Sequence, residues 1–257
     1  MKALKAKQRG RTGEIVAGKI HKKDIPVSET ERWNKNEREI LYPDSDGKPM
    51  AENTKQFDWI VKIKEGLEIL FADTPDVFVA GDLFWYPVKG NNKIRTAPDV
   101  MVAFGRPKGY RGSYRQWEEE DIAPQVVFEI LSPGNTPKEM KEKCLWYERY
   151  GVEEYYLYDP DGIELDGWIR SGKRLQPVKE MQGQISPRLN IRFELGSDDL
   201  TLFRPDGQTF LSPLEMARRA EDKIRHAELK AEQEKKRAEL LEAKLKSLGI
   251  SENGWSI

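Results

Sequence analysis

Cysteine and long apolar runs are scarce in this sequence. Cys144 is its single cysteine, which excludes a disulfide within the chain and is typical of a protein in a reducing cytoplasm. No stretch approaches the roughly 18 to 20 apolar residues of a membrane-spanning helix. We therefore expect a cytoplasmic protein without a membrane span.

An excess of positive charge is missing as well. The 43 Lys and Arg against 44 Asp and Glu leave a net charge of −1, so no global basic field indicates a nucleic-acid partner, although a local basic cleft would suffice for one. Residues 1–38 are locally basic, but no apolar segment follows these charges, which excludes a secretory signal. We predict a flexible basic arm over 1–38, with weak phosphate binding as the alternative.

What the sequence does contain is a carboxylate inside an apolar run. Residues 126–131 read Val-Val-Phe-Glu-Ile-Leu, which predicts a buried strand. Burying a carboxylate is costly unless it is paired, hydrogen-bonded or bound to a cation. Glu129 is therefore the leading candidate for a functional acid. The alternative is a structural glutamate that lies at an open strand end or caps a backbone amide.

Two other acids accompany strands in the same way. Asp99 opens the apolar run 100–104, directly after Pro98, and Asp82 lies within the apolar stretch 77–86. A carboxylate on each of two core strands suits Mg²⁺, which takes one or two carboxylates and keeps several waters. The alternatives are ordinary ones: Pro-Asp is a common turn dipeptide, and Asp82 can be a turn or bulge acid.

A helix start follows the strand that carries Glu129. Thr136 has the position of an N-cap, Pro137 that of the first helical residue, and Gly151 that of a helix end. Within this helix an apolar stripe is formed by Met140, Cys144 and Tyr147. Lys143 lies beside the stripe, so its ammonium can reach Glu129; the alternative is a lysine that extends into solvent.

These blocks resemble the Uma-two family of restriction endonucleases, which is abundant in cyanobacteria and belongs to the PD-(D/E)xK nuclease superfamily. The resemblance covers roughly residues 40–210 and rests on Pro98-Asp99-Val100, on 128–133, on Lys143 with Tyr147, and on 151–160. It implies Asp99, Glu129 and Lys143 as catalytic residues, Asp99, Glu129 and Asp82 as metal ligands, and Mg²⁺ or Mn²⁺ as cofactor. The superfamily's usual lysine, two residues after the acid, is Leu131 here. The family pattern instead places the lysine on the following helix, at Lys143.

For residues 39–212 we predict an endonuclease-like domain of the α/β class, with a mixed β-sheet flanked by helices as in restriction endonucleases. The expected elements are a helix over 54–72, an antiparallel hairpin over 77–104 and a strand over 154–158 that lies parallel to the Glu129 strand. Hairpins near 168–175 and 192–203 are expected to extend the core sheet. The segment 105–121 mixes basic and aromatic residues, which favours a loop facing the substrate; a surface loop with partly buried aromatics is the alternative.

The composition changes from Pro213 onward. Ten positions from Ala217 to Leu248 keep a strict spacing of three and four, and all but Glu234 are apolar. This spacing predicts a coiled-coil helix over 213–249, which favours a homodimer. A single amphipathic helix packed on its own domain is the alternative.

Taken together, these features predict a Mg²⁺-dependent endonuclease that hydrolyses DNA phosphodiester bonds, with DNA implied by the resemblance alone. A dimer suits this activity because it brings two sites to two strands. The competing hypothesis is a catalytically degenerate nucleic-acid-binding or scaffold protein that self-associates through its C-terminal coiled coil. A metal titration separates the two hypotheses, because a degenerate site should bind neither Mg²⁺ nor Mn²⁺.

Overall fold

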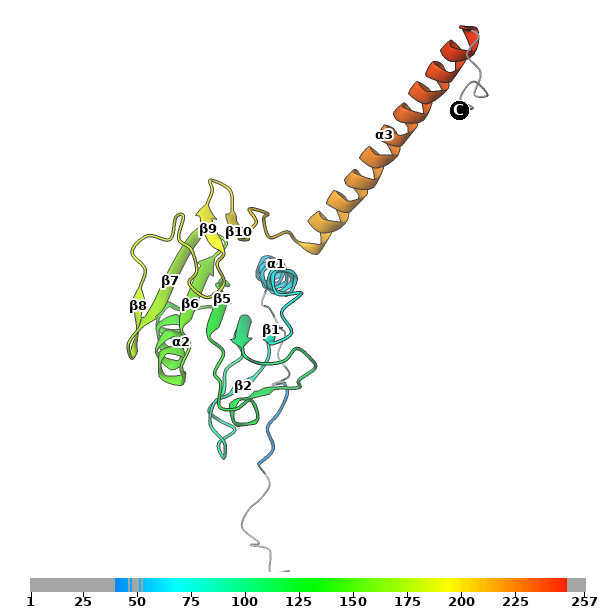
Figure 1. The fold of residues 1–257 in the computed structure, drawn as a ribbon. Helices are drawn as coiled ribbons and strands as arrows, with labels where there is room; N and C mark the ends of the chain where they lie inside the picture. Colours follow the sequence, from blue (N-terminus) through cyan, green and yellow to red (C-terminus); the bar gives the residue numbers. More distant parts are fainter. Residues whose placement is uncertain (1–39, 46, 48–50, 52, 249–257) are drawn as a thin grey trace, which may run out of the picture. The chain divides into compact units, whose positions relative to one another are not determined.

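The computed structural model describes residues 40–45, 47, 51 and 53–248 (Figure 1). The predicted arm over 1–38 lies outside these residues. In chain order the elements are α1 (Thr54–Leu70), β1 (Val77–Gly81), β2 (Trp85–Tyr86), β3 (Val100–Phe104), β4 (Tyr114–Arg115), the 3-10 helix η2 (Gln116–Glu118), β5 (Val126–Ile130), α2 (Pro137–Tyr150), β6 (Glu154–Asp159), β7 (Glu164–Ser171), β8 (Arg174–Pro177), β9 (Arg192–Leu195), β10 (Leu200–Phe203) and α3 (Pro213–Ser247).

A six-stranded sheet forms the centre of the fold, in the order β1-β3-β5-β6-β7-β8. Its strands pair antiparallel except for β5 and β6, which are parallel. The parallel pair arises because α2 carries the chain back between β5 and β6, as a crossover helix does. The predicted α/β class with a mixed sheet is therefore confirmed.

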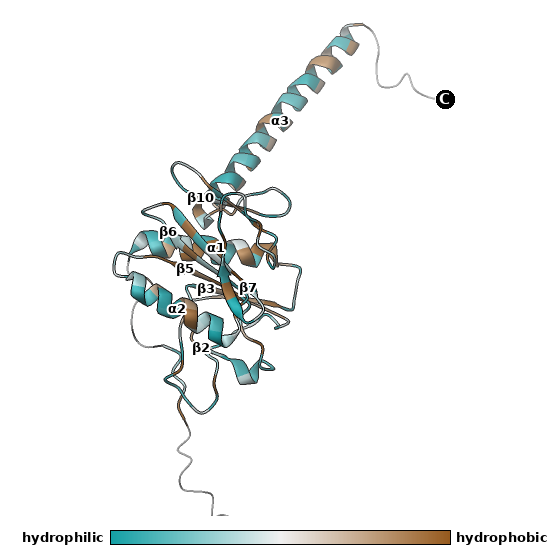
Figure 2. Cartoon of the chain, turned by 90° about the vertical axis from the view of Figure 1, so that its left-hand side faces the viewer, coloured by the Kyte–Doolittle hydropathy of each residue, from teal (hydrophilic) through white to brown (hydrophobic). Residues whose placement is uncertain are grey.

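Helices α1 and α2 cover opposite faces of this sheet (Figure 2). Val126 and Phe128 of β5 pack in the apolar cluster that contains Ile63 of α1, whereas Val127 packs in the cluster that contains Tyr147 of α2. Side chains alternate between the two faces along a strand. Glu129 therefore points toward α2, and this orientation decides which helix can contact its carboxylate.

The apolar stretch 77–86, which we expected to form the first strand of the hairpin over 77–104, is not one continuous strand. β1 ends at Gly81 because Asp82 adopts the left-handed backbone region, with φ 45°, and its N–H donates to the carbonyls of Pro98 and Asp99. After this bulge β2 leaves the sheet and pairs in parallel with β4 instead. The antiparallel pairing of β1 with β3, predicted as a hairpin, is confirmed.

The two later hairpins form as predicted, but only one of them extends the core. β7 and β8 continue the central sheet, whereas β9 and β10 make a separate two-stranded sheet. The β9–β10 ribbon stays separate because its apolar side packs against the sheet. Phe193 is fully buried, and its ring centroid lies 4.7 Å from that of Tyr156. The β9–β10 ribbon thus contributes to the core on the α1 side and does not add to the sheet edge.

Helix α2 has the predicted ends. The side chain of Thr136 accepts a hydrogen bond from the N–H of Glu139 at 3.2 Å, and Pro137 occupies the first turn. At the other end Gly151 takes a left-handed conformation, with φ 102°, and its N–H donates to the carbonyl of Tyr147. These caps satisfy backbone groups at the two termini and so set where the helix begins and ends.

Helix α3 begins with a capping box between Ser212 and Glu215 and runs to Ser247, as predicted, although Gly249 lies outside the described residues. None of its residues is buried. Apolar residues remain exposed along it, among them Ile224, Leu241 and Leu245. In the part of the chain that the structure describes, no helix combines the length and apolarity that crossing a bilayer requires.

Candidate active site

The carboxylate of Glu129 lies at the end of β5 and is enclosed by α2. Its side chain is 3% exposed. The Nζ of Lys143 lies 2.9 Å from one carboxylate oxygen, and the hydroxyl of Tyr147 donates a hydrogen bond to the other. The predicted approach of Lys143 to Glu129 is confirmed. Both oxygens of the buried acid are therefore held by side chains that lie one helical turn apart on α2.

The pKa values of these two partners follow from their surroundings. Burial opposes the charge on Lys143, but the carboxylate of Glu129 outweighs it and raises the pKa of the ammonium. Burial, together with the negative charge of Glu129, holds the pKa of Tyr147 well above its usual value. At neutral pH Lys143 is thus a cation and the Tyr147 hydroxyl is a donor.

Asp99 lies immediately before β3, beside Glu129. One of its carboxylate oxygens accepts a hydrogen bond from the backbone N–H of Ile130 at 2.6 Å. In the antiparallel pairing of β3 with β5, Val100 lies opposite Phe128. One residue further along this register, Asp99 lies opposite Glu129. Burial, and then the charge of Glu129, raises the pKa of Asp99 to about 8.

Asp82 is the third acid near this place. Its negative charge also raises the pKa of Asp99, by less than burial and the charge of Glu129 do. Within the described residues, however, no three His, Cys, Asp or Glu side chains gather closely enough to hold a metal ion together. A role for Asp82 as a metal ligand therefore stays a prediction.

The pair of Asp99 and Glu129 nevertheless suits Mg²⁺ or Mn²⁺. Two carboxylates with water completing the shell match the chemistry of Mg²⁺. Asp99 is crowded by Glu129 and driven toward its protonated form, a repulsion that a divalent cation would relieve. The buried hydroxyl of Tyr155 has no hydrogen-bond partner in the described residues, and the charges of Glu129 and Asp99 both act on its pKa. The surroundings of the acid pair thus leave a polar group for a bound ligand or its water.

The neighbouring cavity that Lys143 lines has a volume of about 280 Å³. Its walls are formed by Arg95, Thr96, Glu139, Glu142, Lys143, Trp146 and Tyr147. Lys143 and Tyr147, the two side chains that hold Glu129, thus separate this cavity from the acids, since neither Asp99 nor Glu129 is among its lining residues.

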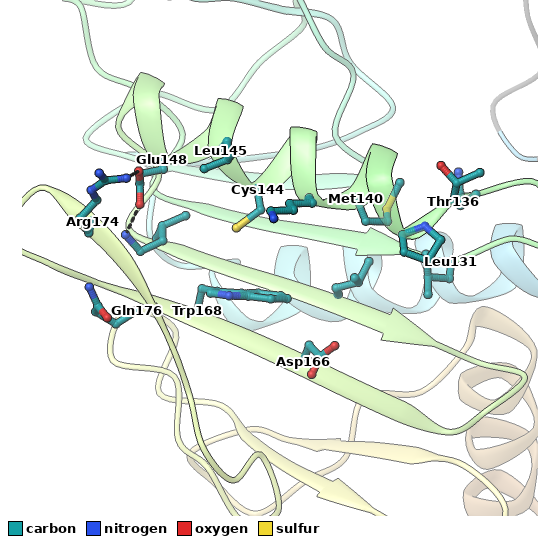
Figure 3. Close-up of a pocket in the computed structure, with 15 residues that line it drawn as sticks. Leu131, Thr136, Met140, Cys144, Leu145, Glu148, Asp166, Trp168, Arg174 and Gln176 are labelled. Atoms are coloured by element: carbon teal, nitrogen blue, oxygen red, sulfur yellow. Dashed lines mark hydrogen bonds and ion pairs between the residues drawn. The ribbon is translucent and has the colours of Figure 1, made fainter.

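A larger cavity, of about 740 Å³, lies between α2 and the strands β6 to β8 (Figure 3). Leu131, Cys144 and Trp168 are among its lining residues, and Glu129 and Lys143 are not. Leu131 occupies the position where the superfamily usually has its lysine. Its side chain lines this cavity together with both apolar and charged residues.

The segment 105–121 was predicted to face the substrate, and much of it instead packs inward. Arg106 and Arg111 both form ion pairs with Glu119, at 3.0 and 2.5 Å, and Tyr114 is fully buried. These side chains are therefore engaged within the protein, in agreement with the alternative of a surface loop with partly buried aromatics. Among the aromatic residues of the segment, Tyr110 remains open to solvent, at 95% exposure.

Two contacts of the site were not predicted from sequence. Tyr147 was assigned to an apolar stripe, and its hydroxyl in fact binds Glu129. The side chain of Gln56, near the start of α1, donates to the carbonyl of Ile130 at 3.0 Å. The peptide groups of Ile130 are thus held by Asp99 on one side of the sheet and by Gln56 on the other. A tyrosine one helical turn after a candidate lysine is the signal that would have indicated the first contact.

We predict that the metal-free protein loses stability as the pH rises toward 8. The pKa of Asp99 is about 8 in the folded protein against an ordinary value of 3.8. The folded state keeps a proton that the unfolded state releases, so the contribution of Asp99 to stability is fully present below the ordinary pKa and is lost as the pH rises through this window. In urea unfolding, the free energy of unfolding should decrease by on the order of a few kcal/mol between about pH 4 and pH 8. The Asp99→Asn variant should lack the decrease that Asp99 causes. Equal slopes for wild type and Asp99→Asn would contradict the prediction.

Comparison with known proteins identifies the family to which the chain belongs. A family model, Uma2, described as "Putative restriction endonuclease", matches residues 29–201, more than half of the 257-residue chain. The chain belongs to this family, as its motifs indicated. Among solved structures it is similar to "a putative nuclease belonging to DUF820" from Anabaena variabilis, with a TM-score of 0.41 and 18% identity over 55% of this chain and 74% of that chain. No curated protein matches it.

Proposed function

We propose that this protein is a metal-dependent endonuclease that hydrolyses phosphodiester bonds of DNA. One observation carries the proposal: the ammonium of Lys143 lies 2.9 Å from the carboxylate of Glu129, with Asp99 on the adjacent strand. Two acids and a lysine at one strand end could hold a divalent cation and stabilise the negative charge that develops on a phosphate. Family membership supports a nuclease function, and DNA is the substrate that restriction endonucleases cleave.

Each residue has a distinct role in this proposal. Asp99 and Glu129 would hold Mg²⁺ or Mn²⁺, and a bound cation of this kind activates water and offsets charge on the leaving oxygen. Lys143 would orient the attacking water or stabilise the negative charge that develops on the phosphate. Tyr147 keeps Glu129 in place, because its hydroxyl remains a donor at neutral pH.

The direct test is cleavage of plasmid and genomic DNA in the presence of Mg²⁺ or Mn²⁺. The control is the same reaction with a chelator that removes the divalent cation. Cleavage that requires the cation and disappears when Glu129 is changed supports the proposal. The competing hypothesis, a degenerate nucleic-acid-binding or scaffold protein, predicts no cleavage and no cation binding. Isothermal titration of the protein with each cation distinguishes the two outcomes without relying on activity.

We also propose that α3 joins two copies of the chain. Its 3,4-spaced seam has no buried residue within the described chain, and seam residues such as Leu241, at 52% exposure, remain open to solvent. A seam of this kind is covered when a second helix packs against it. A homodimer would give the enzyme two sites for a duplex.

The dimer is testable with neighbouring leucines. Leu241 belongs to the seam, whereas Leu240, at 72% exposure, lies outside it. We expect Leu241→Glu to weaken self-association at micromolar concentration by light scattering, because it buries a charge in the interface, and Leu240→Glu to leave it unchanged. Removing residues 213–248 should leave a folded core with weaker association. A monomeric wild-type chain in the same measurement would refute the dimer.

A further inference from the structure

Arg95 stands out among the residues that line the cavity beside Lys143. It lies in the connection between β2 and β3, four residues before Asp99, so one short segment carries both a candidate catalytic acid and this cation. Its guanidinium lies over the ring of Phe84, 4.7 Å from the centroid, and donates to the carbonyl of Asn92 at 3.3 Å. The side chain is thus supported on an aromatic surface next to the site.

The charge of Arg95 has no carboxylate partner among the described residues. Other arginines of the domain do, for example Arg106 and Arg111, which share Glu119. Lys143, the other cation of the cavity, is already paired with Glu129. Arg95 also has a hydrogen bond with the hydroxyl of Tyr86, a neutral partner, so its charge remains unpaired with an acid and can meet an incoming anion.

The other described residues that line the cavity give no further unpaired cation, so an anion that binds there has to bind through Arg95. Glu139 and Glu142 line the same space and repel negative charge. A planar guanidinium with a supported stem presents several donors in a fixed plane, which suits the oxygens of a phosphate. From these contacts we propose that Arg95 binds a backbone phosphate of the DNA strand that occupies the site. The inference rests on the proposed nuclease function and adds a substrate-positioning residue to it.

Equilibrium binding tests this role apart from catalysis. Fluorescence anisotropy with a labelled DNA duplex, in the Glu129→Gln background and without metal, gives affinity as a function of salt. We expect Arg95→Ala to weaken binding roughly tenfold at low salt and to reduce the salt slope by about 0.9, as the loss of one phosphate contact does. Arg95→Lys should keep the slope and recover part of the affinity, because the charge remains while the planar fork is lost.

Two matched controls sharpen the measurement. Arg149, which lies over Tyr150 in the last turn of α2, does not line the cavity, so Arg149→Ala should bind DNA as the wild type does. Glu142→Gln removes a negative charge from the cavity wall and should tighten binding. If circular dichroism shows that Arg95→Ala does not fold, Arg95→Gln keeps side-chain length over Phe84 without the charge and takes its place.

The outcomes separate the inference from the proposed function. A wild-type slope and affinity for Arg95→Ala, or for a folded Arg95→Gln, would overturn the role of Arg95 while DNA binding and cleavage stand. A chain that binds no DNA in any of these variants, and cleaves none with Mg²⁺ or Mn²⁺, would overturn the proposed function as well.

Discussion

Glu129→Gln should fold as the wild type does and lose DNA cleavage by a factor on the order of 10³, since a catalytic cation contributes several kcal/mol to the transition state. The amide keeps the size of the side chain and an oxygen that can accept from Tyr147 or Lys143. What it loses is the negative charge, which is the property a cation ligand needs. Rates measured with Mg²⁺ under single-turnover conditions give this factor directly.

Glu129→Ala serves as the harsher comparison. It leaves the fully buried hydroxyl of Tyr147 without its acceptor, so we expect a lower free energy of unfolding, by about 1–3 kcal/mol. Both variants should also bind Mg²⁺ more weakly in isothermal titration. Wild-type cleavage by folded Glu129→Gln would show that this carboxylate does not serve the reaction, and the candidate site would then be rejected.

Lys143→Ala should lower the cleavage rate by about 10²–10³-fold, the loss expected when one group that stabilises developing charge is removed. Its ammonium is the one cation that contacts Glu129 in the described structure. The change also leaves the buried carboxylate without its ion pair, so the free energy of unfolding should fall by roughly 2 kcal/mol. Rates must therefore be compared below the midpoint of thermal unfolding.

Neighbouring lysines on α2 provide the controls for this prediction. Lys138 and Lys141 are exposed, and neither contacts Glu129, so their alanine variants should cleave as the wild type does. Lys143→Arg should restore only part of the rate, because a planar fork replaces a compact charge. Cleavage at the wild-type rate by Lys143→Ala, combined with an inactive Glu129→Gln, would refute the role of this lysine and leave the acids in place.

Much of the candidate site could be predicted from local signals. Thr136, Pro137 and Gly151 define α2 through hydrogen bonds and backbone conformations that involve neighbours in sequence. The helical position of Lys143 beside the apolar stripe then directs its side chain toward the sheet. Glu129 was evident because a carboxylate in an apolar run requires a partner. These conclusions hold because each depends on a period or a cap only a few residues long.

Other contacts of the site depend on residues that are distant in the chain. Asp99 binds the N–H of Ile130, and Gln56 binds the carbonyl of the same residue, although neither is near it in sequence. The ring of Tyr147 is buried in the core, and its hydroxyl donates a hydrogen bond to Glu129 there. No local pattern predicts the partners of Asp99 and Gln56, because the sheet register and the packing of the helices decide which polar groups come together.

What the sequence by itself determined is the mixed α/β class, the two ends of α2, membership of the Uma2 family and the candidate residues Asp99, Glu129 and Lys143. Only the tertiary structure decided that β1 ends at Gly81, because the next residue, Asp82, takes a left-handed backbone conformation and donates its N–H to the carbonyls of Pro98 and Asp99. It also decided that β9 and β10 form a separate ribbon. In both cases burial and backbone hydrogen bonding compete between distant segments, and the balance depends on the whole fold.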